Sequence, residues 1–173
     1  MSSVLQSLVG KRVVGIAEMC VSDQPDDLLI TYALGSCIGL VVWDPQVRVG
    51  GMLHAMLPTH TLDPDRARGN PERFVDSGVP ALFRACYELG ARKERMIVRV
   101  AGGSRMVAGD GQDNFQTGKR NVLMLKKLLW KNGVILDAEE TGGSVSRTVS
   151  LDVGTGEVLI KSGSEVRPLG KSA

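Results

Sequence analysis

The sequence predicts an α+β fold, a layered α/β sandwich of mixed, mainly antiparallel sheets with about two to three helices. Three observations indicate this class. Short runs rich in Val, Ile and Leu recur along the chain and are typical of strands. Glycine accounts for 21 of the 173 residues, which indicates many tight turns. Only two stretches have the apolar spacing of an amphipathic helix.

Four strands and a loop are expected between residues 11 and 71. The strands are expected at residues 11–20, 27–34, 38–44 and 48–57. The last two are joined at Asp44-Pro45-Gln46-Val47, where Asp opens a turn and Pro fixes φ at its second position. The segment 58–71 has three prolines and no periodicity. It is expected to be a surface loop and a candidate rim for a binding site.

The remainder alternates helices and strands. A helix is predicted over 72–89, with a kink at Pro80 and an end at Gly90, and a second over 120–132, ending at Gly133. Strands are expected at residues 95–101, 134–138, 145–153 and 157–161. The last two form a hairpin turning at Gly154-Thr155-Gly156. One domain is expected over 1–173, with its core at about 10–161 and a flexible tail at about 162–173.

Charge and composition exclude several classes of protein. The net charge is only +2, without the basic stripe of a nucleic-acid binder. The longest apolar run, 38–43, is far shorter than the roughly 20 residues that cross a bilayer. The N-terminus also lacks the pattern of a secretory leader. We therefore expect a cytoplasmic protein, a monomer, without membrane insertion or nucleic-acid binding.

Nothing in the sequence indicates a cofactor or a metal. The glycine-rich stretch 101–114 lacks both the ending of a P-loop and the spacing of a dinucleotide fold. The three cysteines are widely spaced, which argues against a disulfide framework and a zinc site. Cys20, Cys37, His54 and His60 also lack the short spacing typical of metal ligands.

The hairpin predicted over 38–57 brings a thiol and an imidazole together. If Asp44 faces Val47 across the turn, the antiparallel register places Cys37 directly opposite His54. Directly opposed residues share one face of the sheet, with Cβ atoms about 4.5–5.5 Å apart. A one-residue bulge at the glycines 50 and 51 would instead move His54 to the other face. The prediction therefore depends on an unbulged register.

An imidazolium in that position is strong enough to activate the thiol. Lowering a cysteine pKa from about 8.5 to about 6 requires roughly 3.4 kcal/mol. A charge about 4 Å away supplies roughly 4 kcal/mol at an effective dielectric constant near 20. Peptide N–H groups of the turn are candidates for holding an oxyanion, so Gly35, Ser36 and Gly39 are the candidate residues for substrate and oxyanion support. Ser36 is not expected to be a nucleophile, because the motif Gly-x-Ser-x-Gly needs glycine at position 38.

A structural interpretation has equal weight from the residues alone. A cysteine in an apolar strand is often a small buried hydrophobe, and a histidine there often serves as a hydrogen-bonded structural residue. Because Cys37 and His54 are expected to pair across the strands, a catalytic role for them has about the same weight as a structural role.

Three segments carry a resemblance to a known family. They read TYALGSCIG at 31–39, WD at 43–44 and GMLHAMLP at 51–58. With them the chain resembles CheD, the family of chemoreceptor glutamine deamidases of bacterial chemotaxis. Further matching segments are Arg73-Phe74-Val75-Asp76, Gly102-Gly103, Gly118-Lys119-Arg120-Asn121, residues 138–143, Arg147 and residues 155–158.

This resemblance implies an activity and a catalytic triad. It assigns the nucleophile to Cys37, the histidine to His54 and the third residue to Thr31, whose role depends wholly on the resemblance. The implied reaction is hydrolysis of specific glutamine side-chain amides on the cytoplasmic helices of methyl-accepting receptors, through a thioester, to glutamate and ammonia. Methyl-ester hydrolysis is an implied side activity. The implied fold is similar to the deamidase domain of cytotoxic necrotizing factors.

Two alternatives stay open. The same Cys-His pair suits a thiol amidase or peptidase that acts on another substrate. Family members in some bacteria bind the phosphatase CheC, so the chain is also a candidate binding module for a CheC-type phosphatase.

Overall fold

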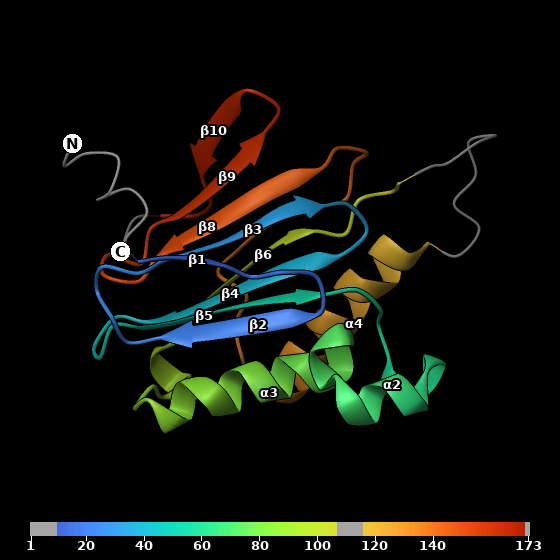
Figure 1. Ribbon diagram of the computed structural model, residues 1–173, viewed down its shortest axis with the longest axis horizontal. Coiled ribbons are helices and arrows are strands. Elements are labelled where there is room, and N and C mark those ends of the chain that lie inside the picture. The colour runs from blue at the N-terminus through green and yellow to red at the C-terminus, as the bar shows by residue number, and fades with distance from the viewer. Residues whose placement is uncertain (1–9, 107–115, 172–173) are drawn as a thin grey trace.

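The computed structural model describes residues 10–106 and 116–171, which form two five-stranded sheets and a layer of helices. The outer sheet has the order β1-β3-β8-β9-β10, and the central sheet has the order β2-β5-β4-β6-β7. Figure 1 shows the helices on one side of the central sheet and the outer sheet on its other side. Most of the glycine-rich stretch after β6 lies outside the described residues.

The strands of the outer sheet are β1 (Lys11–Val13), β3 (Leu28–Leu34), β8 (Arg147–Asp152), β9 (Val158–Ser162) and β10 (Glu165–Pro168). Those of the central sheet are β2 (Glu18–Ser22), β4 (Ile38–Asp44), β5 (Val49–Ala55), β6 (Ile97–Gly102) and β7 (Ala138–Thr141). Most neighbours are antiparallel, whereas β1 with β3 and β6 with β7 are parallel. The α+β class with mixed, mainly antiparallel sheets is thereby confirmed.

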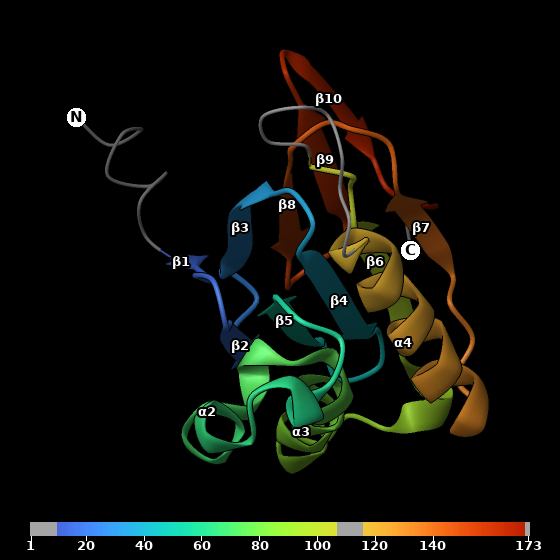
Figure 2. The same cartoon turned by 90° about the vertical axis from the view of Figure 1, so that its right-hand side faces the viewer.

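The helical layer contains α2 (Pro64–Gly69), α3 (Val75–Glu88) and α4 (Thr117–Lys131). Helix α3 packs on β2 and β5, and α4 packs on β4 (Figure 2). One apolar core lies between the helices and the central sheet, and a second lies between the two sheets. Because β4 and β5 are covered on both faces, every residue in them is buried.

The register of the β4–β5 hairpin differs from the predicted one. Asp44 pairs with Val49 rather than with Val47, so four residues rather than two connect the strands. Asp44 accepts from the N–H of Gln46 at 2.9 Å, and Arg48 adopts φ of +52°, a combination that closes the longer turn. The two extra residues move the pairing by an even number, which preserves the faces of the strands.

Three other expected elements need correction. The strand expected over 11–20 is divided into β1 and β2, in different sheets, and Ala17 in the connection has φ of +59°. The expected loop 58–71 instead forms the 3-10 turn η1 (His60–Leu62), capped by Thr59, and α2, capped by Asp63, and it leads into a second 3-10 turn, η2 (Pro71–Arg73). The strand expected at 134–138 is β7, which begins at residue 138 where it can pair with β6.

The C-terminal segment is not a free tail. Residues 165–168 form β10, which extends the outer sheet beside β9. Leu169 is buried in the core between the sheets, which gives this segment an apolar anchor.

Candidate active site

Thr31 and His54 meet across the interface between the two sheets. Thr31 comes from β3 of the outer sheet, and His54 comes from β5 of the central sheet. Their side chains are buried, with Thr31 Oγ1 2.7 Å from His54 Nδ1. Only the packing of the sheets brings these residues together, since no strand pairing connects them.

The hydrogen bonds of Thr31 determine the tautomer of His54. The Thr31 hydroxyl donates its single proton to the Val14 carbonyl at 2.7 Å. It must therefore accept from His54, so Nδ1 carries the proton and Nε2 carries the lone pair. Nε2 is buried and makes no hydrogen bond to any residue of the described ranges. His54 thus presents an unengaged basic nitrogen.

Cys37 lies on the same face as this histidine, but not directly opposite it. The ladder places Gly39 opposite His54 and ends at the pair Ile38 and Ala55. Cys37 is in the bend just before β4, two residues from Gly39, and is therefore a diagonal neighbour of His54 on that face. Its side chain is half-buried and packs against the core between the sheets. The two residues lie on a common face, while the predicted direct pairing is wrong.

Gly39 leaves room for the close packing of β3 residues on β4. A Cβ at this position would lie 2.7 Å from Leu34 Cδ1 and 3.5 Å from Thr31 Cγ2. A side chain there would therefore displace the Leu34 side chain and fill the space beside Thr31.

The bend that carries Cys37 is fixed by its carbonyl groups. The Gly35 carbonyl accepts from the N–H of Ser104, and the Cys37 carbonyl accepts from the N–H of Gly103, both at 2.9 Å. Between them, the Ser36 carbonyl accepts from the Asn121 side chain, also at 2.9 Å. Because a trans peptide points its N–H opposite to its C=O, the N–H groups of Ser36 and Cys37 are directed away from these donors.

Asn121 is a site residue to which the sequence reasoning gave no role. It is fully buried on α4, and its side-chain NH2 donates both to the Ser36 carbonyl and to the Met56 carbonyl at 2.9 Å. If the β4–β5 ladder continued, Met56 would be the partner of Cys37. The amide thus joins the bend that contains Cys37 to the chain just after β5, the strand of His54. Its only sequence signal was its place in the segment Gly118-Lys119-Arg120-Asn121.

A buried ionic network supports the other side of the bend. The Arg147 guanidinium donates to Glu140 at 2.8 Å and to the Ser104 hydroxyl at 2.9 Å. Gly102 must be glycine, because its φ is +108° and a Cβ would lie 2.2 Å from the Cys37 carbonyl oxygen. These contacts hold the segment 102–104 in place, where its N–H groups bind the carbonyls of the bend.

Burial favours the neutral forms of both the Cys37 thiol and the His54 imidazole. Desolvation raises the pKa of Cys37, although its own backbone N–H and the positive charge of Arg73 oppose that rise. Desolvation lowers the pKa of His54 below its usual value, against the opposing charge of Glu18. The resting pair at neutral pH is thus a thiol and a neutral imidazole. The expected imidazolium, which would have ionised the thiol in advance, is not favoured by this environment.

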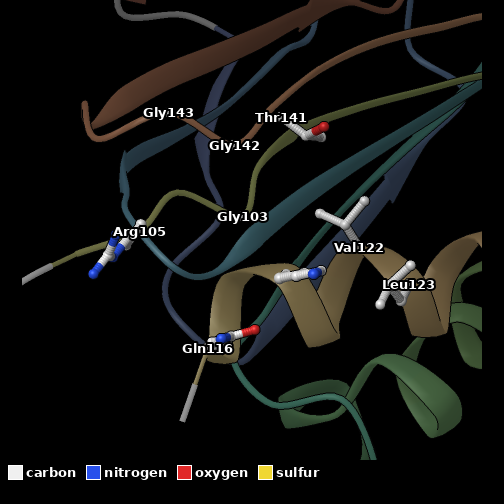
Figure 3. Close-up of a pocket in the computed structure, with 9 residues that line it drawn as sticks. Gly103, Arg105, Gln116, Val122, Leu123, Thr141, Gly142 and Gly143 are labelled. Atoms are coloured by element: carbon white, nitrogen blue, oxygen red, sulfur yellow. The ribbon is translucent and has the colours of Figure 1, made fainter. Parts of the chain in front are cut away.

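A hollow of about 510 Å³ adjoins the bend, between the start of α4 and the ends of β6 and β7. Gly103, whose N–H binds the Cys37 carbonyl, lines it. Arg105, Val122 and Leu123 are among its other lining residues (Figure 3).

The other thiols and the second histidine lie apart from this site. His60 is hydrogen-bonded to Asp76, with Nδ1 2.7 Å from the carboxylate. Cys20 pairs with Met52 in the β2–β5 ladder, and burial raises the pKa of Cys86 to about 12. The described ranges contain no cluster of three or more metal-binding side chains. No helix within them is long and apolar enough to cross a membrane.

Comparisons with known proteins give a consistent result. The family model "CheD chemotactic sensory transduction" matches residues 56–162. A Syntrophus aciditrophicus protein described as a probable chemoreceptor glutamine deamidase, CheD 1, is 47% identical over 154 residues, covering 89% of this chain and 95% of the relative. A Solibacter usitatus protein described as a probable chemoreceptor glutamine deamidase is 46% identical over 157 residues, covering 91% and 92%.

A further relative and a solved structure also match this chain, to different degrees. A Thermococcus kodakarensis protein with the same description is 40% identical over 148 residues, covering 86% of this chain and 90% of the relative. The crystal structure of a Neisseria meningitidis protein matched to the family model DUF152 superposes with a TM-score of 0.47 at 11% identity. That superposition covers 82% of this chain and 66% of the other.

Proposed function

This chain belongs to the CheD family, and from that premise we propose that it is a chemoreceptor glutamine deamidase. It hydrolyses the side-chain amides of specific glutamines on the cytoplasmic helices of methyl-accepting chemotaxis receptors, giving glutamate and ammonia. Cys37 is the nucleophile, His54 the general base and acid, and Thr31 the residue that orients the imidazole.

One observation carries the assignment of roles. The Thr31 hydroxyl donates to Val14 and accepts from His54 Nδ1, which leaves the lone pair of Nε2 unengaged on the face that carries Cys37. A base must have an unprotonated nitrogen within reach of the proton that it removes. A purely structural histidine would be expected to use both ring nitrogens once it is buried.

The first half of the reaction forms a thioester. His54 Nε2 takes the Cys37 proton as the sulfur attacks the carboxamide carbon, and the carbonyl oxygen becomes an oxyanion. The N–H groups of Ser36 and Cys37 are suited to hold this oxyanion, because the carbonyls of the same two peptide units, those of Gly35 and Ser36, are bound to donors on the opposite side. His54 then returns the proton to the nitrogen, the C–N bond breaks, and ammonia leaves.

The second half of the reaction releases glutamate. His54 Nε2 removes a proton from water, whose oxygen attacks the thioester carbon. The C–S bond breaks, and the proton held by the imidazole returns to the Cys37 sulfur. The Arg73 charge, which favours the ionised form of Cys37, stabilises the sulfur as it leaves.

Mass spectrometry of a purified receptor cytoplasmic fragment tests the proposal. Incubation with the protein should convert particular glutamines to glutamates, and Cys37→Ser should abolish the conversion, because a hydroxyl is much harder to deprotonate than a thiol. Cys20→Ser is the matched control and should keep the activity. Full activity of Cys37→Ser would contradict the assignment. If Cys37→Ala left receptor adaptation unchanged in cells, a binding role such as docking of a CheC-type phosphatase would replace it.

A further inference from the structure

Helix α4 concentrates positive charge in a nearly neutral protein. The chain has a net charge of +2, whereas α4 contains no Asp or Glu and five cationic residues, Lys119, Arg120, Lys126, Lys127 and Lys131. Within the described ranges only Lys126 among them forms an ion pair, with Glu139 at 2.9 Å. The remaining cations are available to an external anionic surface.

The same helix exposes large apolar side chains. Leu123 is 55% exposed and Trp130 is 81% exposed. They are seven residues apart, which places them on one side of the helix, two turns from each other, with Lys127 between them. An exposed apolar stripe interleaved with charge is typical of an interaction surface rather than of a solvated helix face.

The stripe continues into a groove and towards the active site. A groove of about 320 Å³ lies between α4 and the segment that follows β5, and Pro58, Leu62 and Leu123 line it. Leu123 also lines the larger hollow beside the nucleophile bend (Figure 3). Asn121, on the same helix, binds the Ser36 carbonyl next to Cys37. A partner lying along α4 would therefore have one part of its length beside the catalytic site.

We propose that this surface, formed by Leu62, Leu123, Lys127 and Trp130, docks an acidic, amphipathic helix of the receptor substrate. The proposal rests on the proposed function and adds the place where the substrate helix binds. Apolar side chains of the partner pack on Leu123 and Trp130, and its carboxylates face the cations of α4. The groove beside Leu62 accepts one protruding side chain, a feature that suits a helix better than a flat membrane surface.

Trp130 makes docking directly observable. The chain has two tryptophans, and Trp43 is buried with its Nε1 donating to the Val153 carbonyl at 2.8 Å. Addition of a tryptophan-free chemoreceptor cytoplasmic fragment to the Cys37→Ala variant should therefore shift the emission of Trp130 to shorter wavelength. The apparent Kd should rise with salt, because exposed charges are screened. Absence of a shift at saturating fragment would overturn the proposal.

Paired variants separate docking from chemistry. Lys127→Glu should raise the KM for the receptor fragment about tenfold with kcat little changed, because charge complementarity acts on association. Lys161→Glu, an exposed charge reversal on β9, is the control and should leave KM unchanged. Trp130→Ser should raise KM in the same way, whereas Val166→Ser on β10, which is also exposed, should not. Equal effects of the paired variants would contradict the proposal.

Further measurements distinguish a receptor helix from other possible partners of this surface. They also distinguish failure of the docking proposal from failure of the proposed function. If Lys127→Glu lost binding to anionic lipid vesicles while its KM for the fragment stayed unchanged, the surface would be a membrane-binding site instead. If Trp130→Ser lost self-association while its KM for the fragment stayed unchanged, the surface would be an interface with a second copy of the chain. Binding is measured on the catalytically inactive variant. A fragment that binds but is never deamidated by the wild-type protein therefore contradicts the proposed function, while deamidation that is insensitive to α4 variants contradicts only the docking surface.

Discussion

The side-chain amide of Asn121 lies 2.9 Å from the Met56 carbonyl oxygen, one residue beyond Ala55, where the β4–β5 ladder ends. Its second donor contact, to the Ser36 carbonyl, connects the bend that contains Cys37 to the chain just after β5, the strand of His54. The positions of Cys37 and His54 relative to each other therefore depend on a residue more than sixty positions further along the chain.

Replacement of Asn121 by Asp should lower kcat more than it raises KM. The carboxylate keeps the shape of the amide, but it has no N–H to donate to the Ser36 and Met56 carbonyl oxygens. Each buried hydrogen bond that is lost in this way costs about 1–3 kcal/mol of folding free energy. Steady-state kinetics on the receptor fragment and urea unfolding measure the two effects. Asn132→Asp, at the exposed end of α4, is the control. A variant with normal kcat and reduced stability would show that Asn121 is only structural.

Replacement of Thr31 by Val should lower kcat/KM about 10- to 100-fold. The variant removes the acceptor of the His54 Nδ1 proton and the donor to Val14, so the imidazole loses its fixed tautomer. Thr31→Ser keeps the hydroxyl and should retain most activity. Nitrogen NMR of the His54 ring should show Nδ1 protonation in the wild type and in Thr31→Ser, but a mixture of tautomers in Thr31→Val. An unchanged tautomer in Thr31→Val would contradict the assignment.

Replacement of Gly102 by Ala should impair both stability and catalysis. Its Cβ would strike the Cys37 carbonyl oxygen, and its positive φ adds strain of about 1 kcal/mol or more. Gly90→Ala is the matched control, because Gly90 has φ of +99° but nothing within 4 Å of the added carbon. Both variants should lose stability through backbone strain, while only Gly102→Ala should lose kcat. Equal kcat losses would show that strain alone is responsible.

The activity should fall on the acid side with a midpoint below the ordinary histidine pKa of about 6.5. Burial lowers the pKa of His54, so the base stays neutral to lower pH than a solvated histidine. A profile of kcat/KM against pH on the receptor fragment measures this midpoint. A midpoint above 6.5 would indicate the thiolate–imidazolium pair that the sequence suggested.

The same lowered pKa makes stability depend on pH. In the unfolded chain, histidine takes up a proton below about pH 6.5, whereas folded His54 stays neutral. Below about pH 6.5 the unfolded state therefore binds more protons than the folded state, and acid favours unfolding. The contribution of His54 to the free energy of unfolding is complete above about pH 6.5 and is lost as the pH falls towards the pKa of folded His54. Urea unfolding at pH 7.5 and 5.5 should show a smaller pH dependence for His54→Gln than for the wild type.

Much of the site was predictable because its signals are local. His54 lies on β5 and Cys37 directly before β4, and a short turn joins these strands, so alternation along the chain places both residues on a common face. The exact register was not predictable, because the turn length depends on Arg48 adopting a left-handed conformation and on Asp44 binding within the turn. A difference of one residue in that length, or of any odd number, would have moved His54 to the other face of the sheet.

The sequence by itself determined the α+β class, the two helices that follow residue 72, and the thiol and imidazole that share one face of a hairpin. Local propensity, turn residues and strand periodicity act over a few positions, and these features need nothing more. Tertiary structure alone decided that Thr31 of the outer sheet would reach His54 of the central sheet, and that Asn121 of α4 would hold the bend of Cys37. Those contacts join segments far apart in the chain through the packing of layers, and the burial that results keeps the imidazole a neutral base.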